Sequence, residues 1–247
     1  MRVPLKLKFY YFLSHFIQNK KTPNFSMDIP RDIRDGEEFS LEKLKKYLSE
    51  NSISNENLSL KQFPSGYSNL TYFLESSSKQ FVLRRPPFGA KSLQGGHDML
   101  REYNVLKNLK SQFSKVPDVF LYCENDDILG APFYLMERVE GYIIRPNLQQ
   151  KDSPGSDIIQ NVSKSLVSTL VELHNVNIEQ ANLKDLGNIN GYVKRQVEGW
   201  IKRYNHSKTD TIVNMDFISS WLYENQPSEV GSSIVHNDFK YDNLVLD

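Results

Sequence analysis

The sequence predicts an α+β fold in two lobes: an antiparallel-sheet lobe with one main helix, followed by a mainly helical lobe. Strand-like runs separated by turn residues dominate the first half of the chain, and apolar residues at helical spacing dominate the second half. A short charged connection after Val139 divides the two patterns. We therefore expect a basic extension over residues 1–27, a strand-rich lobe over 28–139 and a helical lobe over 140–247.

The strand-rich lobe is expected to begin with a short helix. Ser40 is placed to cap it, and Leu41, Leu44 and Leu48 fall on one of its faces. The elements after it indicate an antiparallel meander that one main helix interrupts. They are three strands, the helix and two more strands, over residues 58–63, 71–75, 81–85, 98–110, 118–123 and 133–139.

The second half has the spacing of amphipathic helices. A long helix is marked by apolar residues three or four positions apart, and two further helices are expected over 192–204 and 217–223. Residues 233–247 are typical of a strand, a polar loop and a second strand. The residues that mark the long helix are Val162, Leu166, Leu170 and Leu173.

Composition excludes several classes of protein. Thirty basic and thirty acidic residues give no net charge, so nucleic acid is not expected as a partner and any polyanion site must be local. The single Cys123 cannot form an internal disulfide, and no apolar run is long enough for an integral membrane span. Residues 1–27 carry only basic charges, which fits an irregular extension, a targeting leader to an organelle or an interfacial helix. Otherwise we expect a cytoplasmic chain.

The segment most informative about chemistry lies near residue 240. His236, Asp238 and Asn243 have the spacing His-x-Asp-x-x-x-x-Asn between two apolar flanks. A carboxylate that accepts a hydroxyl proton, followed by an amide that binds magnesium, is what a catalytic loop for phosphoryl transfer from ATP requires. The alternative is a β-turn whose Asp and Asn side chains bond their own backbone.

A turn between two expected strands is a candidate phosphate loop. Backbone N–H groups in such a turn can lie over phosphates, and its Ser and Asn side chains can add donors. One glycine in a hairpin is also typical of an ordinary turn. The candidate residues are Ser65, Gly66, Tyr67, Ser68 and Asn69.

Two charged residues fall on otherwise apolar surfaces. Side chains alternate faces along a strand, so Arg84 shares the face of Val82, where a cation is costly unless it meets an anion. Glu102 lies on the apolar stripe of the helix over 98–110. A pair between Arg84 and Glu102 explains both placements, although a first-turn glutamate is also favoured by the helix dipole.

The strand over 133–139 ends in charged residues and Gly141, where the lobes change character. Free backbone groups at such an edge can hydrogen-bond a planar base, and Met136 can pack on its face. A simple core strand is the alternative.

These motifs together resemble the aminoglycoside phosphotransferase family of kinase-like folds, and in particular its branch associated with acyl-CoA dehydrogenases. The resemblance covers about residues 58–247, and the segment from His236 to Asn243 is its most specific part. It implies a two-lobed protein-kinase-like fold and an ATP-dependent, magnesium-dependent small-molecule kinase. The strand-rich lobe would then bind the nucleotide.

The resemblance also implies roles for the motif residues. Asp238 matches the catalytic base, His236 belongs to the same motif, Lys240 lies near the transferred phosphate, and Asn243 is a magnesium ligand. Arg84 would contact phosphate with Glu102 as its partner. The nucleotide loop would be Ser65, Gly66, Tyr67, Ser68 and Asn69, and the hinge beside adenine would be Met136, Glu137, Arg138 and Val139.

Two departures from the family pattern follow. Arg84 stands where the family usually has lysine, and a planar guanidinium contacts phosphate differently. The family's second magnesium ligand follows the catalytic loop, and the sequence given stops at Asp247 before reaching it, as if C-terminally truncated. We expect a kinase that moves the γ-phosphoryl group of ATP to a hydroxyl of a small molecule of the aminoglycoside, choline or hydroxyacyl type. The alternative is a catalytically inactive kinase-like remnant or nucleotide-binding module.

Overall fold

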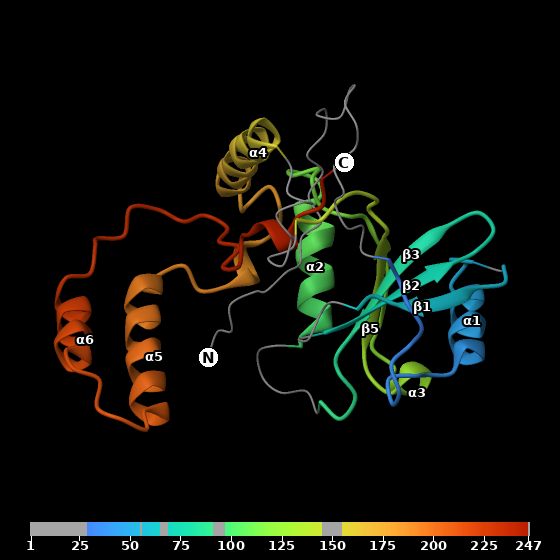
Figure 1. The fold of residues 1–247 in the computed structure, drawn as a ribbon, viewed down its shortest axis with the longest axis horizontal. Coiled ribbons are helices and arrows are strands. Elements are labelled where there is room, and N and C mark those ends of the chain that lie inside the picture. The colour runs from blue at the N-terminus through green and yellow to red at the C-terminus, as the bar shows by residue number, and fades with distance from the viewer. Residues whose placement is uncertain (1–28, 55, 65–68, 91–96, 145–154, 247) are drawn as a thin grey trace. The chain divides into compact units, whose positions relative to one another are not determined.

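The computed structural model describes residues 29–54, 56–64, 69–90, 97–144 and 155–246 (Figure 1). The chain divides into two compact units. The first contains the described residues as far as Leu183 together with the segment that begins at Ile234, and the second is Lys184–Ser233. The long helix and the motif around Asp238 therefore group with the sheet, whereas the sequence-based boundary was drawn after Val139.

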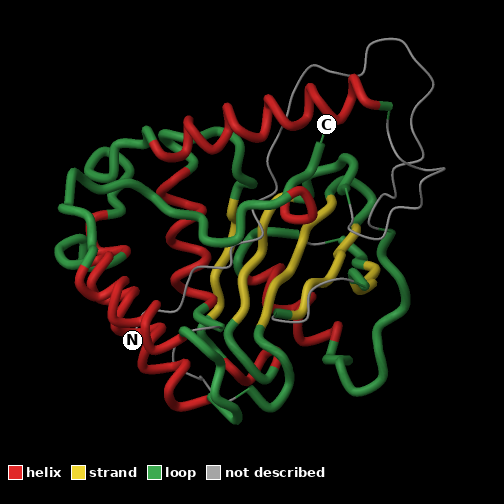
Figure 2. The backbone as a smooth tube through the Cα atoms, turned by 60° about the vertical axis from the view of Figure 1, so that its left-hand side comes forward, coloured by secondary structure: helices red, strands yellow, loops and turns green. Residues whose placement is uncertain are grey.

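The first unit is built on a five-stranded sheet whose strand order is β1-β2-β3-β5-β4. Figure 2 shows the strands of this sheet side by side in yellow. Every neighbouring pair is antiparallel, with Thr71 opposite Arg84 and Arg84 opposite Tyr134. The predicted α+β class and antiparallel sheet are confirmed. The strands are β1 (Ser59–Gln62), β2 (Leu70–Glu75), β3 (Gln80–Arg85), β4 (Val119–Cys123) and β5 (Phe133–Glu137).

Helix α1 (Leu41–Glu50) covers one face of this sheet. The Ser40 side chain accepts a hydrogen bond from the Lys43 amide and caps the first turn. Leu44 and Leu48 are fully buried and pack in one cluster with apolar side chains from β2, β3 and β5. Burial of this kind contributes about 1.5–3 kcal/mol per large apolar side chain, so the α1 face of the sheet is a principal core of the unit.

Helix α2 (Met99–Leu109) lies on the opposite side of the sheet from α1 (Figure 1). The Asp98 carboxylate accepts from the Arg101 amide and begins the helix. The stripe that α2 buries contains the charged Glu102 among apolar residues, as the sequence indicates. This helix is the main one of the sheet lobe.

The polar stretch between β4 and β5 is more than a plain turn. It forms a one-turn helix, α3 (Asp126–Leu129), because the Asn125 side chain accepts from the Asp127 amide and Gly130 ends the turn with a φ of 77°. Four consecutive polar residues, 124–127, make this stretch look like a simple turn in the sequence.

The long helix α4 (Ser156–His174) belongs to the first unit. The chain then forms the second unit and returns to the first at Ile234, in the segment that carries the His236 motif. The expected strand–loop–strand over 233–247 was wrong for the described residues. Only Tyr142 and Leu246 pair, in a single antiparallel bridge, and Tyr241–Asn243 form a short 3-10 helix. Because Leu246 has a partner only at Tyr142, the backbone hydrogen bonds do not extend into a strand pair.

The second unit contains α5 (Tyr192–Ser207) and α6 (Met215–Glu224), which pack on each other. Both predicted helices are present and extend slightly beyond their predicted ends. Among all residues described, no helix has both the length and the apolar character needed to cross a membrane.

Candidate active site

The polar segment around Asp238 is held by buried apolar flanks. Ile234 precedes it and Leu244 and Val245 follow it, and each is no more than 4% exposed. Between them, the Asn243 Nδ2 atom donates to the main-chain oxygen of Asp238 at 2.8 Å and to its Oδ2 atom at 3.0 Å. The amide therefore fixes the Asp238 carboxylate relative to its own backbone.

His236 braces the turn from within. Its ring is 1% exposed and meets the Phe239 ring edge-on at 5.5 Å. The Asp238 amide donates to its Nδ1 atom at 3.2 Å, so Nδ1 is the acceptor of the ring. Asn237 between them has a φ of 64°, which an asparagine tolerates better than most residues. His236 is thus part of the packing that shapes the segment.

Lys240 adds positive charge beside two carboxylates. Its Nζ atom lies 3.4 Å from Asp238 Oδ1 and 3.5 Å from Asp242 Oδ2, and half of its side chain is exposed. Exposed pairs of this kind stabilise a fold only weakly. The arrangement leaves the ammonium near Asp238 and open to solvent.

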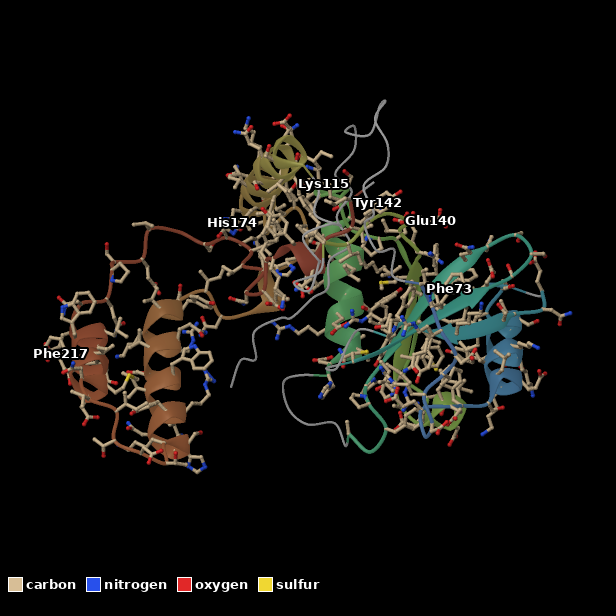
Figure 3. The ribbon with its side chains drawn as sticks, viewed as in Figure 1. Phe73, Lys115, Glu140, Tyr142, His174 and Phe217 are labelled. Atoms are coloured by element: carbon tan, nitrogen blue, oxygen red, sulfur yellow. The ribbon has the colours of Figure 1, made fainter. Side chains whose placement is uncertain are left out.

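Helix α4 supports the segment from another side. The Tyr241 hydroxyl and the Ser163 hydroxyl are 2.8 Å apart. At the far end, Tyr142 and Leu246 exchange both backbone hydrogen bonds, at 2.7 and 2.8 Å, just beyond Glu140 (Figure 3 labels Tyr142 and Glu140). These contacts tie the motif to the chain that leaves β5.

A second group of charged residues lies between the sheet and α2. Arg84 Nε and Glu102 Oε2 are 3.3 Å apart, and the two side chains are 5% and 8% exposed. The structure therefore brings together the pair that the sequence indicates. At this depth, a cation and a carboxylate are stable mainly because each has the other.

Glu102 has further donors that sequence reasoning missed. The Tyr134 hydroxyl donates to Oε2 and the Asn69 Nδ2 atom donates to Oε1, both at 2.9 Å. His97 Nδ1 lies 2.7 Å from Asn69 Oδ1. The strand register could have suggested Tyr134, because it lies opposite Arg84; nothing in the sequence indicates His97.

Arg85 is a buried charge that the alternation pattern did not predict. It is 1% exposed, donates from Nε to the Pro86 carbonyl at 3.1 Å and stacks on the Phe88 ring at 3.6 Å. Burial lowers the pKa of its guanidinium. It projects to the sheet face opposite Arg84, with Leu83, and so lies outside this charged group.

The hinge residues continue the Arg84 face of the sheet. Met136 is opposite Val82, which is opposite Phe73, so these three buried side chains form an apolar row across β5, β3 and β2. The Arg138 guanidinium lies over the Phe73 ring at 4.5 Å (Figure 3 labels Phe73). Strand β5 ends at Glu137, so Arg138 and Val139 follow it as connection.

The predicted site residues thus fall into two described groups within the same compact unit. One centres on Glu102 and the other on Asp238. Ser65, Gly66, Tyr67 and Ser68 lie outside the described residues, and Asn69 is 3% exposed with both polar side-chain atoms bonded to protein.

The site can be compared with known proteins. The profile of the family described as "Phosphotransferase enzyme family" (APH) matches residues 59–247. Acyl-CoA dehydrogenase family member 11 of Rattus norvegicus is 39% identical over 229 residues, which are 89% of this chain and 29% of that protein. Acyl-CoA dehydrogenase family member 10 of Mus musculus is 32% identical over 231 residues, which are 93% of this chain and 20% of that protein. The chain spans less than a third of these relatives.

A solved structure has the same fold. A Ralstonia eutropha protein assigned as an aminoglycoside phosphotransferase superposes with a TM-score of 0.71 and 30% identity. The match covers 84% of this chain and 60% of the other. Both the sheet and the segment around Asp238 lie inside the region that the family profile matches.

Proposed function

The chain belongs to the phosphotransferase enzyme family, and from that premise we propose that it transfers the γ-phosphoryl group of ATP to a hydroxyl of a small molecule. The observation that carries this proposal is the contact between Asn243 and Asp238, which fixes a carboxylate and an amide side by side in the matched region. Phosphoryl transfer depends mostly on positioning and charge neutralisation, and this contact supplies positioning.

Asp238 is the proposed general base. Its side chain is 26% exposed, so a bound hydroxyl can approach it, and Asn243 holds its orientation. Asp238 takes the hydroxyl proton as the acceptor oxygen bonds to the γ-phosphorus and the bond to the β-phosphate oxygen breaks, which leaves ADP. Lys240, 3.4 Å from Asp238, is placed to offset charge on the transferred group.

Magnesium fits the donor atoms of this segment. Asn243 turns Nδ2 toward Asp238, which leaves Oδ1 as an acceptor, and Mg²⁺ prefers oxygen ligands from one or two protein side chains plus phosphates and water. Asn243, with a neighbouring carboxylate, would hold the ion. When bound, the metal supplies neutralisation of phosphate charge.

The sheet lobe is the proposed nucleotide-binding region. Arg84, held by Glu102, offers a cation for phosphate, and the backbone from Met136 to Val139 offers hydrogen bonds to adenine. Ser65, Gly66, Tyr67 and Ser68 are proposed to lie over the phosphates, as their turn-forming sequence favours. The group around Glu102 supports this assignment because Arg84 lies on the same face of the sheet as Met136, so the cation and the proposed hinge face the same side.

The proposed acceptor class is a hydroxyacyl thioester. The relatives are named as members of the acyl-CoA dehydrogenase family, and acyl-CoA is an acyl thioester. Phosphorylation would activate a hydroxyl on the acyl chain of such a thioester. The structural neighbour is assigned to aminoglycosides, so aminoglycosides and sugars are the competing acceptors.

The test is an ADP-release screen of the purified protein with ATP, Mg²⁺ and each acceptor class. Hydroxyacyl thioesters should give acceptor-dependent ADP release, and Asp238→Ala should abolish it while ATP still raises the melting temperature in the presence of Mg²⁺. Asp216→Ala, an exposed aspartate of α6, is the matched control. Unchanged turnover in Asp238→Ala would remove Asp238 as base, and no nucleotide-dependent stabilisation of the wild type would overturn the proposed function.

A further inference from the structure

The buried carboxylate of Glu102 is surrounded by donors from three different segments. Arg84 in β3 faces Oε2 at 3.3 Å, Tyr134 in β5 donates to the same oxygen at 2.9 Å, and Asn69, the residue before β2, donates to Oε1 at 2.9 Å. Glu102 itself is 6% exposed. Each oxygen of the Glu102 carboxylate therefore has its own donor. The side chain cannot rotate without losing a hydrogen bond in a buried, low-dielectric setting, where such a loss is costly.

The orientation of the Asn69 amide follows from its neighbours. A carboxylate accepts only, so the atom of Asn69 that faces Glu102 must be the donor Nδ2. Oδ1 then faces His97 Nδ1 at 2.7 Å, and because a carbonyl oxygen also only accepts, the proton between them lies on Nδ1 of His97. Turning the amide over would set two acceptors against each other at Glu102.

This geometry is difficult to combine with a direct phosphate contact by Asn69. Both polar atoms of its side chain, Nδ2 and Oδ1, already bond to protein. Its position in the sequence, directly after Ser68, suggested a donor to nucleotide; its contacts instead direct its hydrogen bonds to the partner of Arg84.

We propose that Asn69 and Tyr134 are positioning residues for nucleotide binding, which hold the Glu102 carboxylate so that Arg84 is fixed for contact with the nucleotide phosphates. The inference rests on the proposed function, since it assumes that Arg84 contacts phosphate. His97 extends the same chain of bonds by fixing the Asn69 amide.

The sharpest readout separates phosphate binding from base binding. Dissociation constants for ATP with Mg²⁺ and for adenosine are measured by competition against a fluorescent adenosine analogue, for the wild type, Tyr134→Phe and Asn69→Asp. Tyr134→Phe removes one donor to Glu102, and Asn69→Asp replaces the other donor by a carboxylate that repels Glu102. A hydrogen bond to a charged group is worth enough for the loss to weaken ATP binding by about tenfold or more. Adenosine binding should change less than about twofold, because it does not use Arg84.

Tyr122→Phe is the matched control. Tyr122 is the register partner of Tyr134 in β4, and its hydroxyl takes no part in the bonds to Glu102. This variant should bind both ligands as the wild type does, and the melting temperature of every variant is recorded alongside.

The outcomes are distinct. Equal weakening of ATP and adenosine binding, or unchanged ATP binding in Tyr134→Phe and Asn69→Asp, would overturn the positioning roles. The proposed function would stand as long as the wild type binds ATP. A wild type that binds neither ligand would overturn both. If Asn69→Asp fails to fold, Tyr134→Phe alone decides, because it deletes a single hydroxyl.

Discussion

The Asn243 amide donates simultaneously to the backbone oxygen and to the carboxylate of Asp238, at 2.8 and 3.0 Å. The Asn243 side chain thereby fixes both the backbone of the turn and the orientation of the Asp238 carboxylate. Asn243 is 7% exposed, so few other partners compete for its Nδ2 protons. The two residues function as one structural group, and a change in either should be felt by the other.

Asn243→Ala should reduce phosphoryl transfer by about 100-fold or more, because the variant releases the Asp238 carboxylate and deletes an oxygen proposed to bind magnesium. The measurement is kcat for ADP release at saturating ATP. Asn225→Ala, which removes an exposed amide that bonds only the carbonyl of Trp221 in α6, should leave kcat unchanged. Equal rates for the two variants would contradict the coupling of Asn243 to Asp238.

The buried ion pair allows a stability prediction. Arg84→Gln leaves the Glu102 charge without its cation in a buried setting and should lower the free energy of unfolding by about 3 kcal/mol, measured by urea denaturation. Lys46→Gln breaks a pair of similar type with Glu50, 3.9 Å apart and exposed, and should cost about 0.5 kcal/mol or less. Similar losses in both variants would mean that Arg84 and Glu102 are solvated.

Local pattern was enough to predict most of this fold. Each strand of the sheet was expected within two residues of its bounds, because strand runs such as 81–85 are bordered by turn residues. The strands expected over 233–247 do not form among the described residues, because a strand needs a partner, and tertiary structure decides whether a partner lies alongside.

The buried charged group around Glu102 was predictable only in part. Arg84 and Glu102 could be paired from the sequence because each was a charge on an apolar face. Tyr134 and His97 carry no such conflict: a tyrosine in a strand and a histidine before a helix are ordinary there. Arg85 was missed for the opposite reason, since alternation fixes its face and not its burial under Phe88.

The exposed Glu56 offers a pH prediction. Its carboxylate accepts from the hydroxyls of Ser77 at 2.6 Å and Ser78 at 2.7 Å, and these bonds, that of Ser77 foremost, lower its pKa from 4.5 to about 2. Because the folded-state pKa is depressed, this contact stabilises the fold above about pH 4.5, and the stabilisation is lost as pH falls toward 2.

Ser77→Ala should therefore raise the pKa of Glu56 toward its ordinary value, as followed by NMR titration of the carboxyl carbon. Ser111→Ala is the control. The Ser111 hydroxyl donates to the Asn108 carbonyl and not to Glu56, so its loss should leave the titration of Glu56 unchanged. An unaltered Glu56 curve in Ser77→Ala would show that the Ser77 hydroxyl does not hold the charge.

The last prediction concerns the close approach of Gly141 to Val245 and Leu246, at the end of the segment around Asp238. Gly141 has a φ of 155°, and a Cβ atom there would lie 2.3 Å from the Leu246 carbonyl oxygen and 2.6 Å from Val245 Cγ1. Since the Leu246 carbonyl accepts the Tyr142 amide, a side chain at residue 141 must push the bridge apart. Gly141→Ala should thus destabilise the fold by about 2–3 kcal/mol and also disturb Asp238 through the segment it closes.

Gly89→Ala separates strain from contact. Gly89 also has a positive φ, 73°, but nothing lies within 4 Å of an added Cβ, so only backbone strain of about 1 kcal/mol is expected there. Urea denaturation gives both losses, and kcat for ADP release should fall in Gly141→Ala and stay near wild type in Gly89→Ala. Both variants add the same methyl group at a glycine with positive φ. Any extra loss of unfolding free energy in Gly141→Ala therefore measures the contribution of the Tyr142–Leu246 bridge. Equal stability and equal turnover in the two variants would mean that the Tyr142–Leu246 bridge does not hold the segment around Asp238.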